Sequence, residues 1–197
     1  MLLKRLYEFN KTLENTSCTN KENLSLKIDQ AFLTFKDYLI TTKNNRGIVY
    51  VIGNGGSAGI ASHFSNDLIK ALKIPSNTLT DSNILTCLAN DFGYEKCFSE
   101  FLKINLKNED LLVSISSSGN SMNIINATLI ANEKSAKVIT LSGFDSTNKL
   151  RKVGDLNFWI NNKEYGLVEM GHFFILHTLV DLFHSIILEQ EVKAYVR

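Results

Sequence analysis

The chain of 197 residues has little proline, little cysteine and almost no net charge. The single proline, Pro75, suits a helix-rich chain, because proline breaks helix interiors. Three cysteines form neither a C-x-x-C pair nor an even set for disulfides, so we expect a reducing, cytoplasmic setting. Basic residues number 21 and acidic residues 20, with no basic patch, which argues against a nucleic-acid partner.

Signals for export or membrane insertion are also missing. The first residues, Met1 to Arg5, lack the long apolar core of a signal peptide. Charges or histidines interrupt the longest apolar stretches before they reach the length of a membrane span, so we expect no membrane partner. The length suits one domain, which we predict to span 1–197, with an N-terminal helical segment at 1–45 and an α/β core at 46–197.

Helical and strand-like patterns alternate along most of the chain. We predict a short helix at 1–14, a polar break at 15–20 and an amphipathic helix at 21–42. Further strands are predicted at 48–53, 76–80, 110–116, 137–142 and 156–160, and further helices at 57–72, 82–89, 94–106, 121–134, 146–152 and 166–190. Alternating strands and helices favour an α/β fold whose parallel sheet is covered on both faces.

Two small-residue loops each follow a predicted strand and precede a predicted helix. The first is Gly53-Asn54-Gly55-Gly56-Ser57, and the second is Ser116-Ser117-Ser118-Gly119-Asn120-Ser121. A helix N-terminus carries free N–H groups and partial positive charge, which suits a phosphate. The glycines permit positive φ and close backbone approach, and the serines add neutral hydrogen-bonding groups. A tight turn and a simple helix cap are the structural alternatives.

Histidine and carboxylate side chains recur at two places in the sequence. His63 and Asp67 are four residues apart on a predicted helix, which puts both on one face. Such a pair can bind a metal, share a proton or form an ordinary surface hydrogen bond. Glu169 and His177 lie on the apolar C-terminal helix, about 12 Å apart along a straight axis. They can share one ion only if the helix start is irregular or if they come from different chains.

The C-terminal segment from Leu167 to Leu188 is apolar on almost every face. A helix of that kind has to be buried. In a single domain of this size, and together with the amphipathic N-terminal helix, this predicts an interface between copies of the chain. His172 and His184, on the same helix, are more typical of satisfied core residues than of ligands.

Taken together, the motifs resemble the SIS (sugar isomerase) domain family and, within it, the phosphoheptose isomerases. The resemblance extends over about residues 20–190 and includes the turn Asn90-Asp91-Phe92-Gly93-Tyr94. It implies a flavodoxin-like three-layer sandwich with a five-stranded parallel sheet and an added N-terminal helix. It also implies a homotetramer with active sites at subunit interfaces. The implied reaction converts sedoheptulose 7-phosphate to D-glycero-D-manno-heptose 7-phosphate, a step toward heptoses of lipopolysaccharide or capsule.

The resemblance also implies residue roles. It implies sugar contacts for Asn54, Gly55, Gly56, Ser57 and Glu169, and phosphate contacts for Ser116, Ser117, Ser118 and Ser121. It implies open-chain contacts for Asn90 and Asp91. It implies metal ligands, usually to zinc, for His63, Asp67, Glu169 and His177. Isomerisation through an enediol needs a carboxylate near two adjacent carbons and an acid near the oxygens. Asp67 or Glu169 is the candidate base, and His177 is the candidate acid or base at the oxygens.

Four departures from the family pattern leave other functions open. Asp67 stands where glutamate is usual, Glu169 replaces glutamine, Gly166 replaces aspartate, and Leu68-Ile69-Lys70 stands near the usual Thr-Gly-Arg. One alternative is a non-catalytic protein that binds a phosphosugar and acts through a protein partner. Another is an isomerase of a pentose or hexulose phosphate.

Overall fold

Seven strands form one sheet in the part of the chain that the structure describes, residues 1–195 of a computed structural model. The strand order is β2-β1-β7-β6-β5-β3-β4. The strands are β1 (Ser17–Asn20), β2 (Ser25–Leu26), β3 (Val49–Ile52), β4 (Ser76–Asn77), β5 (Leu111–Ser116), β6 (Lys137–Ser142) and β7 (Leu156–Trp159). Five of them, β3 to β7, pair in parallel. Counted in chain order, these five are arranged 2-1-3-4-5, which is the flavodoxin-like order.

The prediction of a five-stranded sheet is corrected by the two strands at the N-terminal side. β1 pairs antiparallel with β7, and β2 pairs antiparallel with β1. In the sequence Ser17-Cys18-Thr19-Asn20 only Cys18 is apolar, so the segment resembled a polar break. It forms a strand because β7 offers backbone partners along its whole length, with Cys18 opposite Phe158. The following helix therefore begins at Ile28 and not at residue 21.

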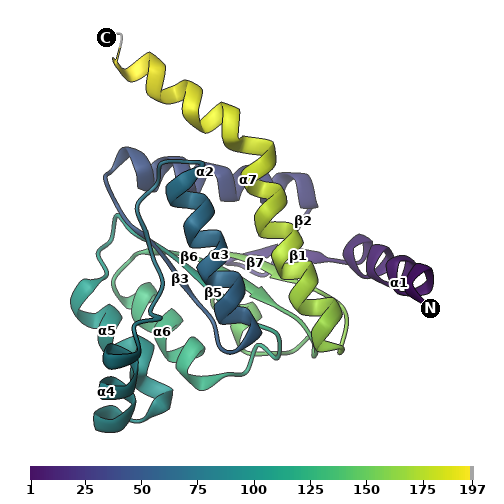
Figure 1. Cartoon of the computed structure of the whole chain (residues 1–197), viewed down its shortest axis with the longest axis horizontal. Helices are drawn as coiled ribbons and strands as arrows, with labels where there is room; N and C mark the ends of the chain where they lie inside the picture. Colours follow the sequence, from purple (N-terminus) through teal and green to yellow (C-terminus); the bar gives the residue numbers. More distant parts are fainter. Residues whose placement is uncertain (196–197) are drawn as a thin grey trace.

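Helices cover both faces of the sheet, as the three-layer prediction requires (Figure 1). They are α1 (Leu2–Glu14), α2 (Ile28–Asn44), α3 (Gly56–Lys70), α4 (Ser82–Phe92), α5 (Cys97–Asn105), α6 (Met122–Glu133) and α7 (Tyr165–Tyr195). Residues of α2, α3 and α7 pack in one core with Val49 and Val51 of β3. Residues of α5 and α6 pack in a second core with Tyr50 and Ile52 of the same strand. Alternate residues of β3 thus serve opposite faces.

Two predicted helices are placed differently in the structure. Of the segment 146–152, only Leu150–Lys152 is helical, as one 3₁₀ turn. Its start is occupied by a side-chain turn, in which Asp145 accepts hydrogen bonds from Thr147. The helix predicted at 82–89 continues to Phe92 and ends at Gly93, whose φ is +87°. The Asn90-Asp91 turn is therefore the last turn of α4.

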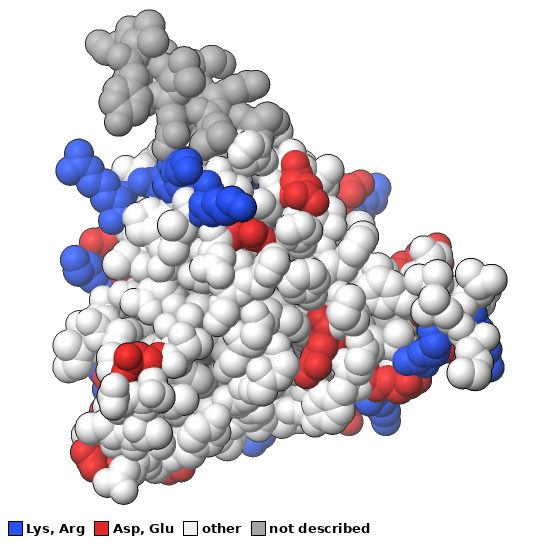
Figure 2. All heavy atoms as spheres, in the orientation of Figure 1, with Lys and Arg blue, Asp and Glu red and all other residues white. Residues whose placement is uncertain are grey.

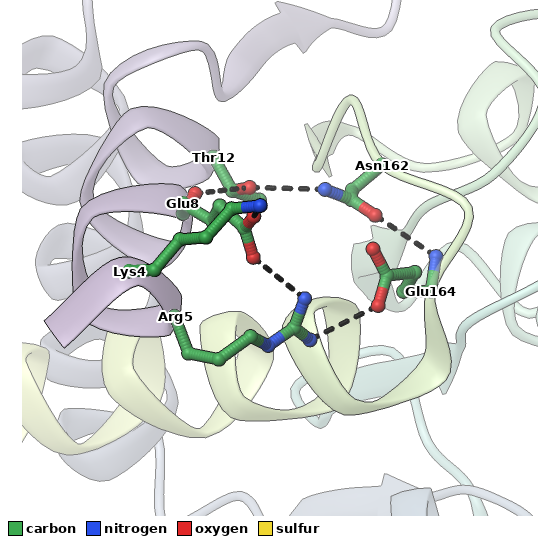
Figure 3. Close-up of polar contacts among 6 residues, drawn as sticks. All are labelled: Lys4, Arg5, Glu8, Thr12, Asn162 and Glu164. Carbon is green, nitrogen blue, oxygen red and sulfur yellow. Dashed lines mark hydrogen bonds and ion pairs between the residues drawn. The ribbon is translucent and has the colours of Figure 1, made fainter. Parts of the chain in front are cut away.

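The N-terminal helix α1 projects from the body and is tied to the segment that precedes α7 (Figures 1 and 3). Arg5 donates to Glu8 at 2.7 Å and to Glu164 at 3.0 Å. Asn162 donates to the Thr12 hydroxyl at 3.0 Å. These contacts hold α1 beside the start of α7. They leave its apolar residues exposed, among them Leu2, Leu3, Leu6 and Tyr7.

The C-terminal helix is long and apolar enough to cross a membrane by length and composition over Tyr165–His184. Half of that window is buried inside the protein, where Ile175, Leu176 and Leu179 join the core. The core helix of a soluble protein passes the same test, so this finding alone is weak grounds for a membrane span.

Buried His172 predicts an acid-sensitive contribution to stability. Its ring is fully buried, with Nε2 3.1 Å from the carbonyl oxygen of Ser142, and burial lowers its pKa from 6.5 to about 4. Below pH 6.5 the His172 ring binds a proton in the unfolded chain, whereas in the folded chain it stays neutral down to about pH 4. The free energy of unfolding therefore falls as the pH drops from about 6.5 to about 4. The loss should reach roughly 3 kcal/mol.

Urea unfolding at pH 7 and at pH 4 measures this effect. In His172→Gln a side-chain amide N–H replaces the ring N–H as donor, and no titrating ring is left. The free energy of unfolding of this variant should therefore fall less between the two pH values. Equal losses in the variant and the parent protein would contradict this role for His172.

Candidate functional site

The two small-residue loops meet at the point where the strand order reverses. β3 and β5 are neighbours in the sheet, and the chain leaves β3 toward β4 on the other side. In sheets of this kind, ligands bind outside the carboxyl ends of the strands at such a switch point. Gly53 to Ser57 follows β3, and Ser116 to Ser121 follows β5. The fold therefore brings both loops to one crevice, as the sequence predicts.

The glycines of the first loop are required by the backbone and by a neighbouring carboxylate. Gly55 has a φ of +53°, in the left-handed region that favours glycine. A Cβ atom at Gly56 would lie 2.5–2.7 Å from the carboxylate oxygens of Glu169. The loop is thus shaped so that the Glu169 carboxylate can approach the N-terminus of α3.

The second loop presents hydroxyls that are not used for capping the helix. Ser121 is the N-cap of α6, yet its side chain makes no capping hydrogen bond and instead lies 3.3 Å from the Ser116 hydroxyl. The Ser117 hydroxyl is buried and has no hydrogen-bond partner. Ser118 accepts from the backbone N–H of Asn120 at 3.2 Å, which leaves its O–H group available to donate to a ligand. The Ser117 hydroxyl is enclosed by protein, so the case for a ligand over a simple helix cap rests on Ser116, Ser118 and Ser121, which line the hollow.

Together the two loops enclose a hollow of about 130 Å³. Its lining combines hydroxyls and amides with one aromatic ring and one carboxylate: Asn54, Ser57, Ile115, Ser116, Ser117, Ser118, Ser121, Tyr165 and Glu169. A larger hollow of about 490 Å³ lies between α1 and the segment before α7. We place the functional site in the smaller one, because it lies at the switch point, between the two small-residue loops.

A network of amides fixes Asn54 at the edge of the hollow. Asn54 and Asn123 exchange two hydrogen bonds of 2.9 Å, and the Tyr94 hydroxyl donates to Asn54 Oδ1 at 2.9 Å. Asn90 and Asp91, the predicted open-chain contacts, are not among the lining residues. Both are exposed on α4, where the Asn90 amide donates to Asp91 at 2.9 Å. Their segment reaches the site through Tyr94.

His63, Asp67 and His177 form a group that could hold a metal ion. Their ligand atoms all lie within 4.8 Å of one another. Asp67 Oδ2 is 3.0 Å from His177 Nδ1 and 3.3 Å from His63 Nε2. Both imidazoles are half-exposed, so a ligand can reach them from solvent. Two nitrogens and a carboxylate are a donor set that zinc accepts, with an open position left for water or substrate.

Within one chain, Glu169 does not join this group. It lines the loop hollow, eight residues before His177 on the regular helix α7. Eight residues of α-helix rise about 12 Å, so the two side chains mark different ends of the site. The expectation that four residues share one ion is therefore met by three of them in the single chain.

A stripe of side chains joins the two ends. Phe173 lies between Glu169 and His177 at four-residue spacing, and its ring stacks on His177 with centroids 5.8 Å apart. It also meets His63 of α3 edge-on at 4.8 Å. Helices α3 and α7 pack side by side along this seam (Figure 1). The site is thus elongated, with hydroxyls at one end and imidazoles at the other.

Four residues of the site were assigned no role from the sequence, although Tyr94 belongs to the turn that the family resemblance includes. Tyr165 lines the hollow, Tyr94 and Asn123 hold Asn54, and Asp181 Oδ2 lies 3.9 Å from His177 Nε2. Tyr165 and Asp181 continue the four-residue spacing of the α7 stripe in both directions, so that periodicity was the available signal. No local signal pointed to the pairing of Tyr94 or Asn123 with Asn54.

Comparison with known proteins places the chain in a family. A family model described as SIS domain matches residues 8–143. The phosphoheptose isomerase of Helicobacter pylori is 34% identical over 149 residues, covering 73% of this chain and 77% of that protein. That of Geobacter sulfurreducens is 30% identical over 167 residues, covering 82% and 88%.

A solved structure agrees with these relatives. The phosphoheptose isomerase of Neisseria gonorrhoeae superposes with a TM-score of 0.79 at 25% identity, covering 92% of this chain and 96% of that one. The chain therefore belongs to the SIS domain family and resembles its phosphoheptose isomerases.

Proposed function

We propose that the protein is an aldose–ketose isomerase that converts sedoheptulose 7-phosphate to D-glycero-D-manno-heptose 7-phosphate. The observation that carries the proposal is the placement of a hydroxyl-lined hollow and an imidazole–carboxylate group at two ends of one seam between α3 and α7. The two relatives named phosphoheptose isomerase support an isomerase that acts on a phosphorylated heptose. Such heptoses serve lipopolysaccharide or capsule.

The hollow suits the phosphate end of the substrate. Ser116, Ser118 and Ser121 offer neutral hydroxyls, and the first turn of α6 adds backbone N–H groups and partial positive charge. The described lining contains no lysine or arginine. Phosphate recognition at this end therefore rests on hydrogen bonds and on the helix dipole.

The length of the seam supports a seven-carbon substrate over a shorter one. Along α7, Glu169 of the hollow and His177 of the imidazole group are separated by a helix rise of about 12 Å. An extended chain covers about 1.2 Å per bond, so a seven-carbon sugar reaches about 10 Å from C1 to phosphorus, and a five-carbon sugar only about 7 Å. The carbonyl of the longer sugar arrives close to Asp67 and His177.

Asp67 and His177, at the carbonyl end of the site, have different proposed roles in proton transfer. Asp67 is the proposed base that moves the proton between C1 and C2, since its carboxylate lies within the imidazole group. His177 exchanges a proton with the sugar oxygens. His63, Asp67 and His177 would hold a zinc ion, which supplies Lewis-acid polarisation of the carbonyl. Glu169 contacts the sugar beside the phosphate.

A panel of sugar phosphates tests the proposal. The purified protein is incubated with sedoheptulose 7-phosphate, a hexulose phosphate and a pentulose phosphate, with and without zinc, and products are followed by NMR. Turnover of the heptulose alone is the expected result. Preferred turnover of a shorter sugar would overturn the proposed substrate. Tight binding without turnover of any of them would favour a regulatory protein that acts through a partner.

We also propose a homotetramer. Large apolar side chains stay exposed along α7, with Met170 56%, Phe174 50% and Leu182 58% exposed. The face that carries α3 and α7 is largely uncharged (Figure 2).

Light scattering at micromolar concentration should give about four times the chain mass. Leu182→Glu should shift it toward smaller species, because a carboxylate is costly in an apolar interface. A parent protein that is monomeric would contradict the assembly.

A further inference from the structure

We propose that Tyr165, braced by Phe144, restricts the phosphate end of the site to phosphate monoesters and rejects phosphodiesters and nucleotide-linked sugars. The inference rests on the proposed function in one respect, namely that the serine-lined hollow receives the phosphate. It concerns residues outside the assigned sugar, phosphate and metal contacts.

Tyr165 stands at the end of the hollow that points away from the reacting carbons. It lies one helical turn before Glu169 on α7, and both side chains line the hollow. The imidazole group lies in the opposite direction, two turns beyond Glu169. A sugar that extends from the hollow toward His177 therefore leaves its phosphate among the serines, with Tyr165 on the side away from the carbonyl. A further group esterified to that phosphate and directed away from the sugar would meet the Tyr165 ring.

The Tyr165 ring is supported from behind. Phe144 meets it edge-on, with ring centroids 4.8 Å apart and planes at 80°. This is a favourable aromatic geometry, and it limits the movement of a ring that is otherwise 61% exposed. Tyr165 thus forms a rim between the hollow and solvent.

The backbone of Phe144 is held in an unfavourable conformation to provide this support. Its φ is +56°, which is rare for a bulky residue and persists only where the surroundings enforce it. Two hydrogen bonds do so: Phe144 N–H donates to the Asn162 carbonyl at 2.9 Å, and Gly143 N–H donates to the Ser117 carbonyl at 3.0 Å. The turn therefore connects the serine loop to the segment that leads into α7. It holds the two walls of the hollow at a set separation.

Binding of a matched ligand pair tests the proposal. Heptitol 7-phosphate has no carbonyl and cannot isomerise, and its methyl ester at phosphorus is the corresponding diester. Calorimetry with the full-length protein should show at least a hundredfold preference for the monoester. Tyr165→Ala should reduce that preference to about tenfold or less, mainly through tighter diester binding, since steric exclusion in a pocket of this kind is worth about that much. Tyr165→Phe should behave like the parent protein.

Further variants distinguish the loss of the Tyr165 rim from a general effect on the folded protein. Phe144→Gly suits the positive φ, so the turn should survive while the ring support is lost, and the preference should fall to an intermediate value. Tyr7→Ala removes an exposed tyrosine of α1 and should change nothing. If Tyr165→Ala keeps the parental preference, the rim role is refuted and the proposed function is untouched. If the monoester fails to bind the parent protein, the proposed function itself is refuted.

Discussion

Replacing Asp67 with asparagine should lower kcat for sedoheptulose 7-phosphate by two to four orders of magnitude, which is the range typical of general acid–base catalysis. The Asp67 carboxylate lies 3.0 Å from His177 and 3.3 Å from His63, at the end of the seam where the carbonyl is expected. The amide of Asp67→Asn still offers an oxygen to a metal but cannot accept a proton from carbon. Bound zinc, measured on the pure protein by mass spectrometry, should fall much less than activity.

Three further variants test whether Asp67 acts as the base within a metal-binding group. His63→Ala and His177→Ala should lose both zinc and activity, because each removes a nitrogen ligand. Asp37→Asn, on the exposed side of α2, is the matched control and should leave both unchanged. A fully active Asp67→Asn protein would remove Asp67 as the base, and His variants with full activity would remove the whole group from the mechanism.

Replacing Ser116 and Ser118 together with alanine should weaken phosphosugar binding at least tenfold while the fold survives. Each hydroxyl that contacts a phosphate oxygen contributes a hydrogen bond to a charged group, worth about 1.5–3 kcal/mol. Both serines line the hollow, and the side-chain hydrogen bonds of both stay within the loop. Calorimetry with heptitol 7-phosphate measures the loss, and circular dichroism checks the fold.

A second double variant provides the control for the serine loop. Ser76→Ala with Ser82→Ala removes two hydroxyls outside the hollow, so the affinity should match that of the parent protein. Unchanged affinity in the Ser116/Ser118 variant would place the phosphate elsewhere. Reduced affinity in both pairs would show a general effect on stability.

Features that depend on neighbouring residues in the sequence were predictable. The Gly53–Ser57 loop, the Ser116–Ser121 loop and the i,i+4 pair of His63 and Asp67 are each encoded within a few residues. The rise of a straight helix also limited how Glu169 and His177 can share an ion, either through an irregular helix start or from different chains. Helix α7 begins at Tyr165, before Glu169, which leaves the second alternative.

Features that depend on tertiary pairing were not predictable in the same way. β1 has almost no apolar pattern, and it is a strand because β7 lies beside it. Tyr94 approaches Asn54 across 40 residues, and Phe144 meets Tyr165 across 21. A propensity scale contains no information on such partners. The short range of periodicity arguments also explains why the end of α4 was placed too early.

The two outermost strands of the sheet, β2 and β4, are only two residues long, and the single proline of the chain directly precedes β4. Short strands and proline leave few free backbone groups for pairing with another molecule. Growth of the sheet by strands from a second copy is therefore disfavoured. In the proposed tetramer we expect copies to associate through helical surfaces, where side-chain packing rather than backbone hydrogen bonds sets their arrangement. A chain shortened to begin at α2 would lose this protection, because the full edge of β7 would face solvent and invite aggregation.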